Sequence, residues 1–358
     1  MTFMMSCTFI TVESFLESCR KVYFATEDYN IAIFITVSAG LYYLFQEKSI
    51  TDEQRREEFL RYQYLCRDNL ETALASLSLL LTPTREMIEA LLLGVSSSLS
   101  KIQHTSNYFK VTYCIEMSKM TLVWQFNSAA AAMCQTLGWH RLQSLDETQD
   151  TISASFWFCY MLDKGLSLRF GRTSIMHDWD ISIPRQFGNA QLVEPWKNVI
   201  NVWIRTGSIL GETYEQLYSS SALARPPEER AQTAQRLVGK MKDLWNEMED
   251  FSVTLRQQDA GLMQGFIQST KDKEWRSTTV EMILKSGRVG HLASLTLIYR
   301  AIPSAPGLPS TFNSECIEAA RMAFKCHEDC MELTSGSLLA KVGYLLWLVT
   351  HLLELCQG

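Results

Sequence analysis

Residues that interrupt regular structure are scarce in this sequence. Only 8 of its 358 residues are proline and 17 are glycine. Together with long periodic stretches of apolar residues, this scarcity favours an all-helical chain. Basic residues are also in the minority, since 33 Lys and Arg stand against 39 Asp and Glu and give a net charge of −6. This balance leaves no basic surface large enough to follow a phosphate backbone.

The sequence lacks the motifs of several enzyme classes. It contains no G-x-S-x-G, no H-E-x-x-H, no phosphate-cradling glycine loop and no dinucleotide fingerprint. Nucleophilic catalysis therefore has no candidate residue. We predict that the chain is not an enzyme, and we name no catalytic, cofactor-binding or metal-binding residue.

Long apolar runs and a disulfide framework are missing as well. Residues 31–45 are uncharged but too short for a membrane span, which needs about 20 apolar residues. The strongly apolar segment 337–355 holds Lys341 and His351, so a core helix or a partner surface is the better interpretation. The start of the chain has no charged region before its apolar residues and does not resemble a signal peptide. The cysteines are scattered singly apart from Cys326 and Cys330, which favours a reducing compartment.

The stretch from 129 to 184 organises the rest of the chain. Its pattern predicts a helix, a turn at Gly138, a second helix and a loop that begins at Gly171. The second helix is apolar on more than one side, which is typical of a helix inside a large core. We therefore predict an all-α fold, a large single domain of about a dozen helices around the central apolar helix 156–169.

Further helices follow from the same periodicity and from capping signals. Thr51 is expected to cap one of them, Thr84 another, and Asp146 the central helix. Residues 219–229 contain two prolines and are the candidate point of subdivision. The predicted helices are 12–24, 31–45, a long one from 51, 84–99, one or two within 108–137, 196–217, 229–255, 275–302, 314–331 and 337–355.

Three blocks in this stretch carry a resemblance to a known family. They are LGWHR at 137–141, FWFCYMLDKGLSLRFGR at 156–172 and DWDISIP at 178–184. In their order and spacing they resemble the middle homology region of fungal transcription factors, the regulators with a zinc binuclear cluster. The chain departs from that pattern at Lys164, where arginine is usual, and at Thr173, where proline is usual. The resemblance covers roughly residues 10–356.

The family's DNA-reading module has no counterpart in this sequence. Members usually carry six cysteines that begin roughly C-x2-C-x6-C and grip two zinc ions ahead of this region. Here Cys7 and Cys19 are eleven residues apart and Cys66 stands by itself. The resemblance therefore implies a regulatory domain without a DNA-binding domain of its own and without a cofactor in this chain.

From the resemblance we expect a fungal transcription regulator, with a metabolic gene set as a plausible target. We expect it in the nucleus, with the cytoplasm left open as a second location. Its expected partners are proteins of the transcription machinery or a second copy of the chain, with DNA contacted only indirectly, no membrane and room for a small-molecule effector. The target genes, the effector, the oligomeric state and the presence of an upstream DNA-binding exon stay open.

The alternative hypothesis is an all-α enzyme or ligand-binding protein, such as a terpene cyclase. Asp146 and Asp150 outline a carboxylate cluster of the kind that holds magnesium, but a second metal motif on a later helix is missing. Acidic residues at a helix start explain both positions more simply. One observation separates the two hypotheses. The pocket of an enzyme should contain converging titratable groups, whereas the pocket of a regulatory domain should be mostly apolar.

Three other groups of residues have a structural interpretation that we prefer. Cys326, His327 and Cys330 lack a fourth ligand, so buried cysteines are the simpler account. His140 and Arg141 end a helix, where cations meet the negative end of its dipole. Asp178 and Asp180 lie in a loop, where one carboxylate is expected to accept hydrogen bonds from Arg172 or a nearby backbone.

Overall fold

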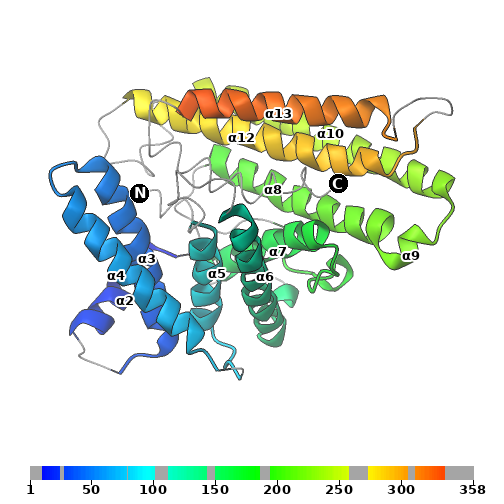
Figure 1. Cartoon of the computed structure of the whole chain (residues 1–358). Helices are drawn as coiled ribbons and strands as arrows, with labels where there is room; N and C mark the ends of the chain where they lie inside the picture. The colour runs from blue at the N-terminus through cyan, green and yellow to red at the C-terminus, as the bar shows by residue number, and fades with distance from the viewer. Residues whose placement is uncertain are drawn as a thin grey trace. The chain divides into compact units, whose positions relative to one another are not determined.

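The computed structural model confirms the predicted helical class. It describes residues 10–24, 28–78, 80–100, 112–142, 150–185, 194–257, 273–304 and 311–334. Within these ranges the regular elements are helices (Figure 1). One isolated antiparallel bridge pairs Pro303 with Phe312. None of the helices in these ranges combines the length and apolar character that a membrane span requires.

The chain divides into two compact units. Unit 1 contains Met1–Cys159 and Trp179–Gln191, and unit 2 contains Tyr160–Asp178 and Leu192–Gly358. The chain passes from one unit to the other inside a single helix, α7 (Asp150–Phe170). Residues 219–229, the candidate point of subdivision, lie within unit 2. The domain limits 10–356 stay a prediction.

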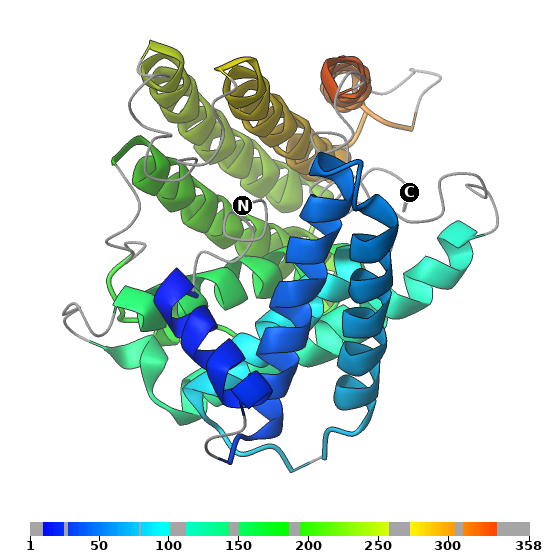
Figure 2. The ribbon, with the colours of Figure 1, turned by 90° about the vertical axis from the view of Figure 1, so that its left-hand side faces the viewer.

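Unit 1 is built from helices that pack around α3. The helix α3 contacts α2, α4 and α5, and α5 contacts α6. Figure 2 shows α2 in dark blue against α3, on the side that faces the viewer. The contact is close because Gly40 has no side chain: a Cβ atom there would lie 2.2 Å from the ring of Phe15. The helices are α2 (Val12–Phe24), α3 (Ile31–Thr51), α4 (Arg56–Ala75), α5 (Arg85–Ser100) and α6 (Thr112–Thr136).

The helix caps of unit 1 confirm one prediction and correct another. Thr84 caps α5, since its Oγ1 accepts a hydrogen bond from the Met87 amide at 3.2 Å. Thr51 was expected to start a helix, but it is the last residue of α3, and its hydroxyl donates to the carbonyl of Glu47. The helix runs past the apolar segment 31–45, so the turn moves on to Asp52, whose carboxylate accepts from the Arg55 amide.

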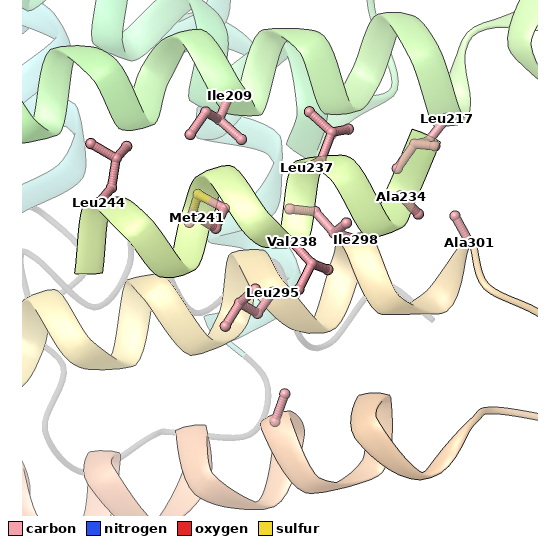
Figure 3. Packing of buried hydrophobic residues seen from close by; sticks show 11 residues of the cluster. Ile209, Leu217, Ala234, Leu237, Val238, Met241, Leu244, Leu295, Ile298 and Ala301 are labelled. Carbon is pink, nitrogen blue, oxygen red and sulfur yellow. The ribbon is translucent and has the colours of Figure 1, made fainter. Parts of the chain in front are cut away.

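Unit 2 is a layer of long helices. Helix α10 packs against α8 and α12, and α12 packs against α13. Figure 3 shows the side chains that fill the space between these helices, from Ile209 on α8 to Ile298 on α12. The elements are α8 (Glu194–Thr213), the π-helical turn η4 (Tyr214–Tyr218), α9 (Ser220–Leu223), α10 (Pro227–Gln257), α12 (Lys273–Arg300) and α13 (Ser314–Thr334).

The central helix α7 is buried, as its apolar sequence predicts. Phe156, Trp157 and Tyr160 have no solvent-exposed surface, and the Lys164 side chain is equally buried. A helix that is apolar on more than one side is buried on more than one side, as expected for a helix inside a core. The predictions for Asp146 and for the helix 337–355 lie outside the described residues.

Candidate functional site

The candidate site begins where α7 ends. Gly171 has a positive φ of 61°, a conformation that glycine adopts without strain. The Arg172 amide then donates to the carbonyl of Ser167 at 3.0 Å, which closes the helix in a Schellman motif. The Ser167 hydroxyl donates to the carbonyl of Arg172. The predicted helix end at Gly171 is confirmed, and the chain turns back along α7.

Asp163 holds this returning loop. It is a buried carboxylate, and its two oxygens accept from the amides of Ile175 at 3.2 Å and Met176 at 3.1 Å. The Ser174 hydroxyl is a third donor. A buried carboxylate is stable only when hydrogen bonds replace its lost water. Asp163 therefore fixes the loop 174–176 against the helix that carries it.

Lys164 forms the centre of a buried polar cluster in unit 2. Its Nζ lies 2.9 Å from Oδ2 of Asp178 and 5.3 Å from the ring centroid of Tyr160. The contact with Asp178 is close enough for an ion pair, although the angles are not those of an aligned hydrogen bond. The other oxygen of Asp178 accepts from the hydroxyl of Tyr160 at 2.6 Å and from that of Ser208 at 3.2 Å.

Helix α8 leaves room for the lysine through a glycine. A Cβ atom at Gly211 would lie 2.7 Å from Cδ of Lys164, well inside van der Waals contact. The backbone of α8 therefore lies directly on the lysine side chain. We call Tyr160, Lys164, Asp178, Ser208 and Gly211 the lysine cluster. Its members come from α7, from the loop after it and from α8.

A second set of contacts, in unit 1, fixes residues 179–184, which we call the tail. Gly138 has a φ of 73° and ends the helical region as predicted, and Trp139–Arg141 form a single 3-10 turn. The carbonyl of His140 accepts from the amides of Ser182 at 2.8 Å and Ile183 at 3.1 Å. The indole nitrogen of Trp157 donates to the carbonyl of Pro184 at 3.1 Å. The tail is therefore tied to the turn and to α7.

Asp180 adds an ion pair to this tail. Its Oδ1 lies 2.5 Å from Nη2 of Arg141, and its Oδ2 lies 3.6 Å from Nε2 of His140. His140 and Arg141 were expected to complement a helix dipole, and the structure adds a carboxylate beside them. Asp180 is the last residue of a short 3-10 turn, Asp178–Asp180. This turn directs the two carboxylates to different partners.

The residues that were considered as metal ligands contact other side chains of the chain. The carboxylates of Asp178 and Asp180 contact Lys164 and Arg141, and Cys330 is buried in a cluster with Met282 and Val289. Burial raises the pKa of the Cys326 thiol above its ordinary value. Across the part of the chain that the structure describes, no three His, Cys, Asp or Glu side chains are grouped so that they could hold a metal ion.

Sequence reasoning missed several members of the site. It named Asp178, and it named Lys164 only as a departure from the family pattern, but it did not predict the contacts of Asp178 with Lys164, Tyr160 and Ser208. It also did not single out Asp163 or Gly211. One signal was available in the sequence. Asp163 and Lys164 are two adjacent charged residues in the middle of a largely apolar helix, and such residues are buried only with partners.

The comparisons with known proteins bear on these same segments. A family model described as the fungal specific transcription factor domain matches residues 5–195, which is just over half of the chain. The chain belongs to this family. All three sequence blocks, and with them Lys164, Asp178 and Asp180, lie inside the matched range of the fungal specific transcription factor domain. The residues after 195 lie beyond it.

A curated relative agrees with the family but covers little of either chain. An uncharacterised transcriptional regulatory protein of Schizosaccharomyces pombe is 39% identical over 72 residues, which is 19% of this chain and 11% of that protein. No solved structure matches the chain. The relative therefore supports the family assignment and leaves the activity and partners of the whole protein to be proposed.

Proposed function

We propose that the chain regulates transcription through protein contacts of its helical fold. The observation that carries the proposal is the match of the fungal specific transcription factor domain to residues 5–195. The contacts of the lysine cluster and of the tail support it, because they give the family's sequence blocks a structural role. In this view the blocks stabilise the domain, and its outer surface meets other proteins.

The proposal has further parts. The chain is not an enzyme, and it needs no cofactor. It contacts DNA only through partners, which are proteins of the transcription machinery or a second copy of the chain. It works in the nucleus on a set of metabolic genes, and a small molecule can act as its effector. The net charge of −6 supports the part that concerns DNA.

A tethered reporter assay tests the regulatory role. Residues 1–358 are fused to an unrelated DNA-binding domain and expressed in a fungal cell with a reporter that carries the matching site. We expect reporter output to change relative to the DNA-binding domain by itself. The untethered chain serves as the control and should leave the reporter unchanged. Unchanged output from a fusion that is present at normal level in the nucleus would contradict the proposal.

A further inference from the structure

The loop before α5 exposes a threonine in a distinctive sequence context. Thr82 precedes Pro83, and among the 8 prolines of the sequence Pro83 is the only one that follows a serine or a threonine. Arg85 stands three positions after Thr82. Threonine, proline, any residue and then a basic residue is the substrate pattern of proline-directed protein kinases. Proline carries no amide hydrogen, so it suits a kinase pocket that offers no acceptor at this position. We call residues 82–85 the acceptor motif.

The acceptor motif has a backbone that a kinase can bind. Residues 81–84 have no regular secondary structure, and Thr82 is exposed. The ring of Pro83 disfavours helical backbone at the residue before it, so Thr82 is biased towards the extended conformation in which kinases bind their substrates. Arg85 is the first residue of α5, and the ends of helices fray. A kinase therefore reaches the whole motif by opening no more than the first turn of α5.

Arg85 also has a partner within its own helix. Its Nε lies 2.7 Å from Oε1 of Glu89, one turn further along α5. The Glu89 side chain is 9% exposed, whereas that of Arg85 is 38% exposed. Burial raises the pKa of the Glu89 carboxyl above its ordinary value, and the charge and hydrogen bond of Arg85 act in the opposite direction. Arg85 therefore helps to keep a nearly buried carboxylate ionised.

We propose that Thr82 is the phosphorylation site of a proline-directed kinase, and that its phosphate competes with Glu89 for Arg85. The kinase transfers the γ-phosphoryl group of ATP. The Oγ1 atom of Thr82 forms the new bond to phosphorus, the bond from that phosphorus to the β,γ-bridging oxygen breaks, ADP leaves, and the hydroxyl proton passes to a base of the kinase. The product carries a charge of about −1.5 to −2 and three acceptor oxygens, which suit a guanidinium group.

The competition links the modification to the packing of unit 1. Three residues of chain span at most about 11 Å, so the side chain of Arg85 can reach a phosphate on Thr82. An arginine that turns to the phosphate leaves the Glu89 carboxylate nearly buried and without its cation, which is unfavourable. Helix α5 contacts α3 and α6, so phosphorylation should destabilise unit 1. The site rests on the acceptor motif and not on the proposed function, so either can fail without the other.

Phosphorylation of the purified whole chain tests the site. The chain is incubated with a cyclin-dependent kinase, magnesium and ATP, and phosphopeptides are mapped by mass spectrometry. We expect phosphate on Thr82, and Thr82→Ala should remove it. Pro83→Ala should slow the reaction, and Arg85→Gln should lower kcat/KM about tenfold, the equivalent of one charge-assisted hydrogen bond.

Ser78→Ala is the matched control for the site. Ser78 is an exposed hydroxyl residue of the same loop, but no proline follows it. The substitution should leave the phosphate on Thr82 and its rate of transfer unchanged. Absence of phosphate from Thr82, or equal rates for Pro83→Ala and the wild type, would overturn the assignment of the site.

Thermal unfolding of the phosphorylated and unphosphorylated chains tests the competition for Arg85. We expect phosphorylation to lower the Tm of the wild type. Glu89→Gln removes the carboxylate that loses its cation, so phosphorylation of this variant should leave its Tm unchanged or raise it. Arg85→Gln gives the same test from the other side, because Glu89 is then without its cation before phosphate is added. An equal fall of Tm in the wild type and in Glu89→Gln, or no fall in the wild type, would refute the competition and leave Thr82 as the site.

Discussion

Asp178 and Asp180 are two carboxylates of one short turn, and their exposure is nearly the same. Their side chains are 30% and 28% exposed. Their cationic partners differ: Lys164 is completely buried, whereas the Arg141 side chain is 65% exposed. An exposed ion pair contributes about 0–1 kcal/mol, while breaking a buried one costs about 3–5 kcal/mol. The burial of the partner therefore decides how much each carboxylate matters.

The largest effect is expected when the buried lysine loses its carboxylate. Asp178→Ala leaves the ammonium group of the completely buried Lys164 side chain without its counter-ion. We expect a loss of about 3–5 kcal/mol in the free energy of unfolding, measured by urea denaturation. Asp180→Ala is the matched control and should cost less than about 1 kcal/mol. Equal losses for the two variants would remove the distinction between them.

A smaller effect is expected when the lysine itself is replaced. Lys164→Met keeps much of the side-chain volume, and the Asp178 carboxylate that remains is partly exposed and still accepts from Tyr160 and Ser208. We expect a loss of about 1–3 kcal/mol in the same measurement. The double variant Lys164→Met with Asp178→Ala should be more stable than Asp178→Ala, because no buried charge is left. A double variant that loses the sum of both single losses would show that the pair is not coupled.

A third effect is expected at the close contact between α8 and Lys164. Gly211→Ala would place a methyl group 2.7 Å from Cδ of Lys164, so the lysine side chain or the helix must shift. We expect a loss of about 1–3 kcal/mol from overpacking. Gly239→Ala on α10 is the control, because nothing lies within 4 Å of a Cβ atom there. It should be neutral or slightly stabilising, since alanine favours helix. A Gly211→Ala variant as stable as the wild type would show that α8 does not press on the lysine.

The smallest effect is expected on the exposed side. Arg141→Ala removes the partner of Asp180 at the surface of unit 1. We expect a loss of about 0.2–1 kcal/mol that shrinks at high salt, because salt screens exposed charges. Thermal unfolding at low and high ionic strength measures both quantities. A loss above about 3 kcal/mol, or one that salt does not change, would show that this pair is as important as the buried one.

The sequence predicted those parts of the fold that depend on local pattern. The apolar residues of α7 and the glycines at 138 and 171 were sufficient to predict a buried helix between two helix ends. Thr51 was misassigned because a threonine followed by Glu53 and Gln54 resembles a cap, although α3 continues through it. Local propensity and helix continuation compete there, and the sequence pattern does not show which prevails.

The members of the candidate site were predictable only in part. The blocks contain Lys164 and Asp178, but their pairing depends on a loop that returns along α7. Ser208 and Gly211 lie on α8, far along the sequence, and a glycine in a helix gives no sign of the side chain that it accommodates. Contacts of this kind arise from tertiary packing, which periodicity does not encode.

The proposal that the chain acts on transcription without reading DNA itself is tested most directly by a titration of the purified chain with duplex DNA. The readout is fluorescence anisotropy at near-physiological salt, with upstream sequences of fungal genes as specific probes and a scrambled duplex as control. The net charge of −6 predicts no binding that distinguishes the two. Binding of one duplex at least about a thousandfold tighter than of the control, with a salt dependence of several phosphate contacts, would contradict it.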